Sequence, residues 1–161
     1  MPIGPISFSG CPARGAVKLA NDAALFNFVV TNQSRVARGL YDEAAIGQFH
    51  RAMQDDLGVI GAHMDGFEYC PHHSNFGRDG AAPVDCRLRK PRLGVILDLM
   101  DRLTIDLERR LLIGDSDADL KLASAAGIAG HLYQACSVDD LLARALRAKN
   151  IDSNLHLHTV T

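Results

Sequence analysis

An apolar run that ends abruptly in acidic residues constrains this chain more than any other feature. It is the segment 110–120, RLLIGDSDADL, whose carboxylates are Asp115, Asp117 and Asp119. A short apolar run bounded by glycine predicts a buried strand of a parallel sheet. Such sheets bind ligands beyond the carboxyl ends of their strands, and Mg²⁺ takes carboxylate oxygens together with substrate phosphate. The segment therefore predicts a metal site, with capping of the next helix by the same acids as the alternative.

Alternation of helical and strand patterns predicts the fold class. Alanine content, apolar periodicity and capping residues predict helices over 13–24, 42–57, 93–103, 118–126 and 138–149. Aromatic, β-branched or continuous apolar runs predict strands over 25–30, 67–69, 110–113 and 128–133. Strands that alternate with helices indicate an α/β fold with a doubly wound, Rossmann-like parallel sheet.

The overall composition is that of one globular domain. With 161 residues, of which 47% are hydrophobic and 22% charged, we expect a single domain over 1–150 and a polar tail over 151–161. A net charge of −2 gives no reason to expect a nucleic-acid or membrane partner, and no apolar stretch is long enough for a membrane span. Four widely spread cysteines and an N-terminus unlike a signal peptide predict a reducing, cytoplasmic location.

Polar residues at two strand ends predict a phosphate site. Thr31 and Asn32 follow the strand predicted at 25–30, and Asp115 follows the strand at 110–113. Lys90, in the loop before a helix, supplies a cation of the kind that pairs with phosphate. Taken singly, these features are equally compatible with a polar turn and a solvated basic loop. Together, Thr31, Lys90 and Asp115 predict a site for phosphate and Mg²⁺.

Four motifs in this order and spacing resemble those of haloacid dehalogenase-like phosphatases, in the heptose bisphosphate and histidinol-phosphate phosphatase branch. They are FVVTNQSRVARG, CPHH, CRLRKP and LLIGDSDADLKLASAAGI, and the resemblance covers roughly 14–133. It implies Mg²⁺-dependent hydrolysis of a phosphate monoester of a small metabolite, a sugar phosphate or bisphosphate.

The resemblance also implies residue roles. Thr31 would hold the phosphate with its hydroxyl, assisted by Asn32. Lys90 would neutralise the negative charge of the phosphate and of the nucleophile. Asp115 would ligate Mg²⁺ and Asp119 would support that site. These roles, and contact of Arg89 with the substrate, are expectations for the residues of this chain. Two departures from the family pattern, Arg35 and Ser116, bear on substrate choice.

The loop over 70–90 resembles the zinc loop of the same branch. Cys70, His72 and Cys86 match its ligands, but Leu88 stands where the family has a second cysteine. A structural zinc site normally has four protein ligands. His73, Asp85 or a water could take the fourth place, and a loop that no longer binds zinc is the alternative.

The largest departure lies at the start of the chain. The family carries its nucleophilic Asp in a DxDGT-type motif on a central first strand, and no such motif precedes Thr31. We therefore expect the sheet to lack its first strand and the chain to be inactive as written, because covalent catalysis needs that carboxylate. Three interpretations follow: a phosphatase whose start is misplaced, a non-catalytic relative that binds a phosphorylated ligand or a partner, and a subunit that completes its sheet with another chain or as a homodimer.

Overall fold

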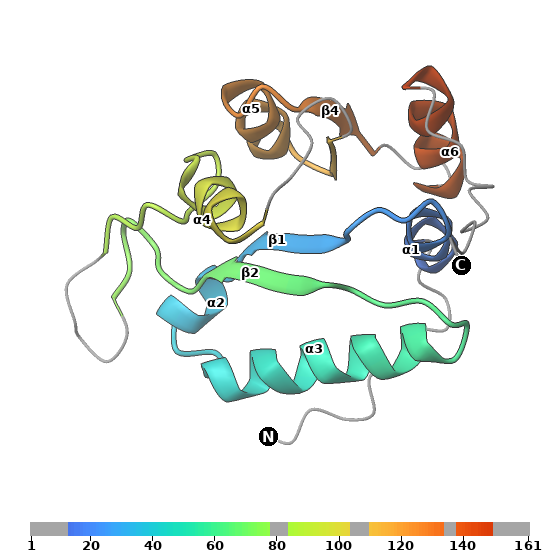
Figure 1. The fold of residues 1–161 in the computed structure, drawn as a ribbon. Coiled ribbons are helices and arrows are strands. Elements are labelled where there is room, and N and C mark those ends of the chain that lie inside the picture. The colour runs from blue at the N-terminus through green and yellow to red at the C-terminus, as the bar shows by residue number, and fades with distance from the viewer. Residues whose placement is uncertain (1–12, 78–83, 104–109, 134–137, 150–161) are drawn as a thin grey trace.

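The computed structural model describes residues 13–77, 84–103, 110–133 and 138–149 (Figure 1). The helices are α1 (Arg14–Asp22), α2 (Ser34–Ala37), α3 (Glu43–Gly58), α4 (Gly94–Arg102), α5 (Asp117–Ala125) and α6 (Val138–Ala148). The strands are β1 (Phe28–Asn32), β2 (Gly66–Cys70), β3 (Leu111–Gly114) and β4 (Ala129–Leu132). All five predicted helices are confirmed, with their ends displaced by at most two residues. None of the described helices is long and apolar enough to cross a membrane.

The strands form two parallel pairs, so the predicted α/β class with parallel strands is confirmed. β1 pairs with β2 in a register that sets Val29 opposite Phe67, and β3 pairs with β4 with Leu112 opposite Gly130. Within the described ranges these are two separate two-stranded sheets, whereas the sequence predicted one sheet. Figure 1 shows β1 and β2 between α3 below and the group of β4, α5 and α6 above.

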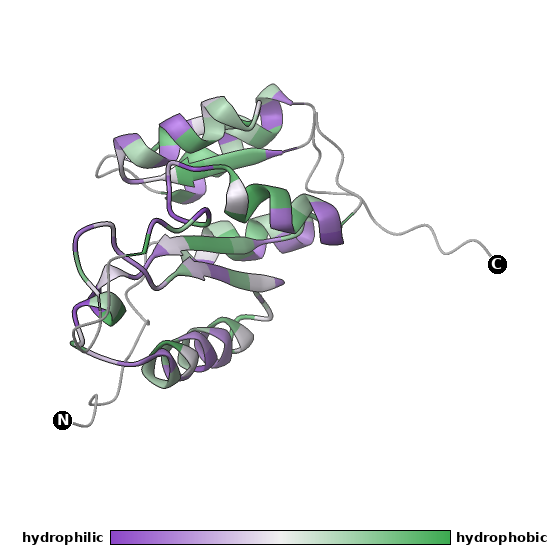
Figure 2. Ribbon diagram, turned by 90° about the vertical axis from the view of Figure 1, so that its left-hand side faces the viewer, coloured by the Kyte–Doolittle hydropathy of each residue, from purple (hydrophilic) through white to green (hydrophobic). Residues whose placement is uncertain are grey.

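The alternation of side chains along β3 places helices on both of its faces. Leu111 and Ile113 pack against a cluster of α1 and α6, which includes Ala16, Ala20, Leu142 and Leu146. Leu112, on the opposite face, packs against a cluster of α4 and α5 formed by Val95, Ile96 and Leu122. Val30 of β1 also packs against this second cluster, so the cluster of α4 and α5 touches both strand pairs. In Figure 2 the helices carry both hydrophilic and hydrophobic residues, as expected of helices with one buried face.

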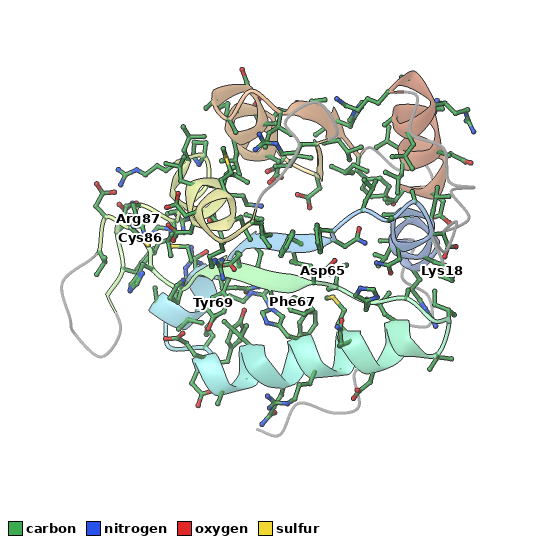
Figure 3. The ribbon with its side chains drawn as sticks, in the orientation of Figure 1. Lys18, Asp65, Phe67, Tyr69, Cys86 and Arg87 are labelled. Atoms are coloured by element: carbon green, nitrogen blue, oxygen red, sulfur yellow. The ribbon has the colours of Figure 1, made fainter. Side chains whose placement is uncertain are left out.

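The remaining face of the β1–β2 pair is covered by α3. Phe67 and Tyr69 point from β2 toward α3 (Figure 3), where the His50 ring stacks on Phe67 at a centroid distance of 4.2 Å. The Tyr69 hydroxyl donates a hydrogen bond to the Glu43 carboxylate at 2.8 Å. The pairing of β2 with β1 confirms the strand predicted at 67–69. The observed strand extends one residue further at each end.

The strand predicted at 25–30 was wrong at both boundaries. The Leu25 N–H bonds to the Ala20 carbonyl, and the Asn27 N–H bonds to the Asp65 carboxylate, so these residues leave α1 as a turn. Thr31 and Asn32 instead pair with Tyr69 and Cys70 at the end of β1. The helix α2, directly after them, was not predicted, because its four residues follow a polar sequence that also fits a turn. The consequence is that Thr31 has a position fixed by the sheet.

The start of the domain expected over 1–150 and the polar tail expected over 151–161 lie outside the described residues. The division into a domain and a tail therefore stays a prediction.

Gly114 lets Asp119 lie directly against the end of β3. A Cβ at Gly114 would overlap the Cβ and Cγ atoms of the buried Asp119 side chain. We expect Gly114→Ala to lower the free energy of unfolding by about 1–3 kcal/mol, as overpacking does in tightly packed sites. The measurement is urea unfolding followed by circular dichroism.

The matched control is Gly58→Ala in α3, where an added Cβ meets nothing within 4 Å. That variant should be stabilised by about 0.4–1 kcal/mol, because alanine restricts the unfolded chain. Equal effects of the two substitutions would show that Gly114 is not a point of close packing.

Candidate functional site

The Lys90 ammonium connects the two strand pairs at their carboxyl ends. It lies 2.6 Å from Asp119 Oδ1, beyond β3, and donates to the Val30 carbonyl of β1 at 2.9 Å. The side chains of Lys90 and Asp119 are only 14% and 5% exposed. Ion pairs this shielded are screened far less by salt and water than surface pairs. The ammonium group therefore connects β1, through the Val30 carbonyl, with the first turn of α5, through Asp119.

Asn32 fixes the backbone of the loop that carries Lys90. Its Oδ1 accepts a hydrogen bond from the Lys90 N–H at 2.9 Å, and its Nδ2 donates to the Lys90 carbonyl at 3.2 Å. Both polar groups of the amide are used in this way. The structure therefore gives Asn32 a positioning role beside the expected contact with phosphate.

Asp119 serves both the site and the start of its own helix, α5. Its Oδ2 accepts hydrogen bonds from the Ser116 N–H at 3.2 Å and from the Ser116 hydroxyl at 2.6 Å, before α5. Burial raises the pKa of Asp119, but the hydrogen bonds from Lys90 and Ser116 outweigh it and hold the pKa below its ordinary value. Asp119 is thus an ionised carboxylate, so the metal-site and capping interpretations are compatible with each other.

A cavity of about 780 Å³ has these groups at one end. Its lining there includes Thr31, Lys90, Asp115 and Asp119, so the structure brings together the residues predicted to bind phosphate and Mg²⁺. Asp115 is exposed, and the Thr31 hydroxyl receives a long hydrogen bond of 3.5 Å from Gln33 Nε2. A hydroxyl, an ammonium and two carboxylates around one space can hold a phosphate group together with a cation.

Two other polar residues singled out by the sequence point elsewhere. Arg89 donates from Nη1 to the His72 carbonyl at 2.9 Å, within the loop over 70–90. It is not among the residues that line the cavity. Asp117 forms an exposed ion pair with Lys121 on the surface of α5, at 2.6 Å.

A second cavity, of about 510 Å³, lies next to the carboxyl end of β1. Asn32, Gln33, Arg35 and Tyr41 contribute to its lining. The Tyr41 hydroxyl donates to Gln33 Oε1 at 2.7 Å, and Gln33 also contacts Thr31. Sequence reasoning did not name Gln33 or Tyr41 as site residues. Nothing in the sequence indicated that Tyr41, after α2, folds back toward Gln33.

Cys70, His72 and Cys86 converge as expected of metal ligands. One potential ligand atom of each lies within 4.8 Å of the others, and both cysteines are buried. His72 Nδ1 is buried without a hydrogen-bond partner. Burial and the neighbouring Cys86 thiol raise the pKa of Cys70 to about 11.

Neither candidate for the fourth ligand belongs to this group. His73 Nδ1 accepts a hydrogen bond from the Asn75 N–H at 3.0 Å. The Asp85 carboxylate forms an ion pair with Arg92 at 2.6 Å. Among the described residues, the group therefore contains three protein ligands.

Sequence comparisons agree with the geometry of the site. A HAD-hydrolase-like family model matches residues 87–152. The D-glycero-beta-D-manno-heptose-1,7-bisphosphate 7-phosphatase of Rhodopseudomonas palustris is 40% identical over 131 residues, which are 81% of this chain and 72% of the relative. The phosphatase of the same name from Vibrio cholerae is 37% identical over 100 residues, or 62% of this chain. The chain matches 53% of that protein, about half of its length.

Solved structures show the same likeness. A HAD-like protein from Mesorhizobium loti superposes with a TM-score of 0.74 at 30% identity, over 86% of this chain and 72% of the other. The D,D-heptose 1,7-bisphosphate phosphatase of Bordetella bronchiseptica, complexed with magnesium and phosphate, gives a TM-score of 0.66 at 32% identity. That match covers 83% of this chain and 70% of the relative.

The shielded Lys90–Asp119 pair should be important for stability. We expect Lys90→Met to lower the free energy of unfolding by about 3 kcal/mol, because it leaves a buried carboxylate without its cation. The control Lys121→Met removes the exposed pair with Asp117, which has 66% and 75% exposed side chains, and should cost less than about 1 kcal/mol. Chemical denaturation measures both, and equal losses would contradict the central position of Lys90.

Proposed function

The chain belongs to the HAD-like phosphatases, and we propose from this premise that its site binds the phosphate group of a small phosphorylated metabolite for Mg²⁺-dependent monoester hydrolysis. We propose a sugar phosphate or bisphosphate as the substrate, because the relatives named above are heptose bisphosphate phosphatases. The observation that carries the proposal is the convergence of Thr31, Lys90, Asp115 and Asp119 at one end of one cavity.

Each of these residues has a role that its geometry supports. Lys90 offsets the negative charge of the phosphate, and Asp119 and Val30 hold its ammonium in place. The Thr31 hydroxyl donates to a phosphate oxygen from the end of β1. Phosphoryl transfer depends mainly on such positioning and charge stabilisation. Asn32 acts as a positioning residue, since both of its polar groups hold the backbone of Lys90.

The carboxylates fit a magnesium ion. Asp115 is exposed at the cavity and Asp119 is ionised behind it, and carboxylate oxygens are the donors that Mg²⁺ prefers. When bound, the ion would neutralise charge on the phosphate. The proposed ligand is Asp115, with Asp119 in support.

The nucleophile is the part of the proposed chemistry that these residues do not supply. No Asp-x-Asp motif precedes Thr31, and a covalent mechanism needs a carboxylate there. We propose that the 161-residue chain binds phosphate without turnover. A non-catalytic protein that binds a phosphorylated ligand is the second candidate, and it differs in that restoring a carboxylate would not produce turnover.

The cavity beside the phosphate site supports a proposal on substrate choice. Arg35 is exposed at its wall, where the family pattern has a small residue. Its guanidinium is suited to a second anionic group of the substrate. Arg35 would then favour bisphosphates over monophosphates.

The cysteine–histidine group supports a structural zinc site. Thiolate and imidazole are the usual ligands of structural zinc, and the unpartnered His72 Nδ1 is suited to such a bond. We propose Cys70, His72 and Cys86 as the protein ligands. Cys70 and Cys86 form no disulfide, which also supports the proposed cytoplasmic location, because thiols persist in reducing compartments.

Phosphate binding tests the proposed function directly. In the presence of Mg²⁺, Thr31→Val should weaken the binding of inorganic phosphate about tenfold, the loss expected for one hydrogen bond to a charged group. Thr31→Ser, which keeps the hydroxyl, should bind like the unaltered chain. Isothermal titration calorimetry gives both constants, and full-strength binding by the valine variant would refute the role of Thr31.

Metal content tests the zinc proposal. The purified chain should hold about one zinc ion, and Cys86→Ser should lose most of it because two ligands bind far more weakly than three. Cys136→Ser is the control and should keep the ion. Plasma mass spectrometry measures the content, and a chain without zinc after expression in zinc-supplemented medium would count against the site.

A further inference from the structure

The Gln33 amide lies between the hydroxyls of Thr31 and Tyr41 and contacts both. Gln33 Nε2 donates to Thr31 Oγ1 at 3.5 Å, and the Tyr41 hydroxyl donates to Gln33 Oε1 at 2.7 Å. All three residues are half-buried, and Gln33 and Tyr41 line the 510 Å³ cavity. A row of three side chains therefore leads from Tyr41 to the hydroxyl that is proposed to donate to phosphate.

The backbone of Gln33 continues the pairing of β1 with β2. Its N–H donates to the Cys70 carbonyl at 2.8 Å, one residue after the end of β1. The helix α2 begins at the next residue and is anchored by two buried side chains, those of Val36 and Ala37. The Cα atom of Gln33 is therefore held between a strand and a helix.

The turn after α2 brings Tyr41 back to Gln33. Gly39 has a φ of +68°, a left-handed conformation that glycine adopts without steric cost. The N–H of the next residue donates to the Arg35 carbonyl at 3.0 Å, as in the Schellman motif that ends many helices. Asp42, directly after Tyr41, caps α3 by accepting a backbone hydrogen bond at 2.9 Å. Tyr41 therefore lies between the end of one helix and the capped start of another.

The orientation of the Gln33 amide decides where the Thr31 proton can go. A threonine hydroxyl has one proton to donate, and its oxygen can accept a hydrogen bond at the same time. The observed amide faces Thr31 with its donor, Nε2, which leaves the Thr31 proton free for another acceptor. With the amide reversed, Oε1 would accept that proton. The Tyr41 hydroxyl favours the observed orientation when it donates to Oε1, and a phenylalanine there would have nothing to donate.

We propose that Gln33 and Tyr41 are positioning residues that orient the Thr31 hydroxyl as a donor toward phosphate. The inference rests on the proposed function, in which that hydroxyl donates to a phosphate oxygen. Neither residue has to contact the phosphate, because Tyr41 acts on Gln33 and Gln33 acts on Thr31. In a network of this kind the loss of one group changes the contribution of another.

Phosphate affinity tests the proposal on the full 161-residue chain. In the presence of Mg²⁺, Tyr41→Phe should weaken the binding of inorganic phosphate about threefold to tenfold, the range expected for one neutral hydrogen bond. Gln33→Met, which keeps the length of the side chain without its amide, should weaken binding at least as much. Isothermal titration calorimetry measures these affinities. Unchanged affinity of Tyr41→Phe would overturn the inference.

A double-mutant cycle distinguishes positioning from a general effect on the fold. In a Thr31→Val chain, which lacks the hydroxyl, Tyr41→Phe should cause no further loss of phosphate affinity. An equal loss with and without the Thr31 hydroxyl would overturn the inference.

Tyr69→Phe is the matched control for Tyr41→Phe. Tyr69 lies opposite Thr31 in the β1–β2 pair, and its hydroxyl donates to the Glu43 carboxylate at 2.8 Å. The control variant thus loses a tyrosine hydrogen bond on the same pair of strands, but one that does not lead to Thr31. It should bind phosphate like the unaltered chain, and a loss equal to that of Tyr41→Phe would overturn the inference.

A measurement without phosphate separates this inference from the proposed function. Nuclear magnetic resonance of an isotopically labelled chain shows the side-chain amide of Gln33, which is identified by its loss in Gln33→Met. Its proton resonances should shift in Tyr41→Phe and in Thr31→Val and stay unchanged in Tyr69→Phe. Such shifts in a chain that does not bind phosphate would confirm that Tyr41 acts on Thr31 through Gln33 and would refute the proposed function. Weaker phosphate binding by Thr31→Val, with Tyr41→Phe unaltered in both measurements, would support the proposed function and overturn the inference.

Discussion

The ion pair between Lys90 and Asp119 is the interaction on which the arrangement of the site depends. Lys90 comes from the loop before α4, and Asp119 from the first turn of α5. Through the Val30 carbonyl, the same ammonium also contacts β1. Three separate parts of the chain therefore meet at one buried charge. Such a group is held in position before any ligand arrives, which is what electrostatic stabilisation of phosphoryl transfer requires.

The Lys90 ammonium also lines the 780 Å³ cavity, where the ends of β1 and β3 bring the candidate site residues. In a parallel sheet, neighbouring strands deliver their carboxyl ends to a common edge. Here β1 and β3 deliver Thr31 and Asp115 to that edge, although they do not pair with each other within the described residues. The cluster of α4 and α5 packs against Val30 of β1 and Leu112 of β3, while α1 and α6 pack on the other face of β3. The residues proposed to bind phosphate therefore line one cavity, although β1 and β3 do not pair with each other within the described residues.

The sequence was sufficient for features that depend on local patterns. Alanine content, apolar periodicity and capping residues located all five long helices, and the apolar run 111–113 located β3. The start of β1 could not be located in this way, because Phe26 fits a strand as well as Phe28 does. Pairing with β2 and the contact of Asn27 with Asp65 decide it. Asn32 was expected at phosphate, whereas its bonds to Lys90 connect residues 58 positions apart, which no local pattern reveals.

The loop before α4 connects the cysteine–histidine group to the phosphate site. Cys86 and Lys90 are four residues apart, and Arg89 between them donates to the His72 carbonyl. At its other end the loop is held closely, since a Cβ at Gly94 would overlap the Arg87 carbonyl, and Arg87 pairs with Asp98 at 2.8 Å. Any ligand that ties Cys86 to Cys70 would therefore restrict the backbone that carries Lys90. A metal in this loop would act on phosphate binding through position, without contact with the substrate.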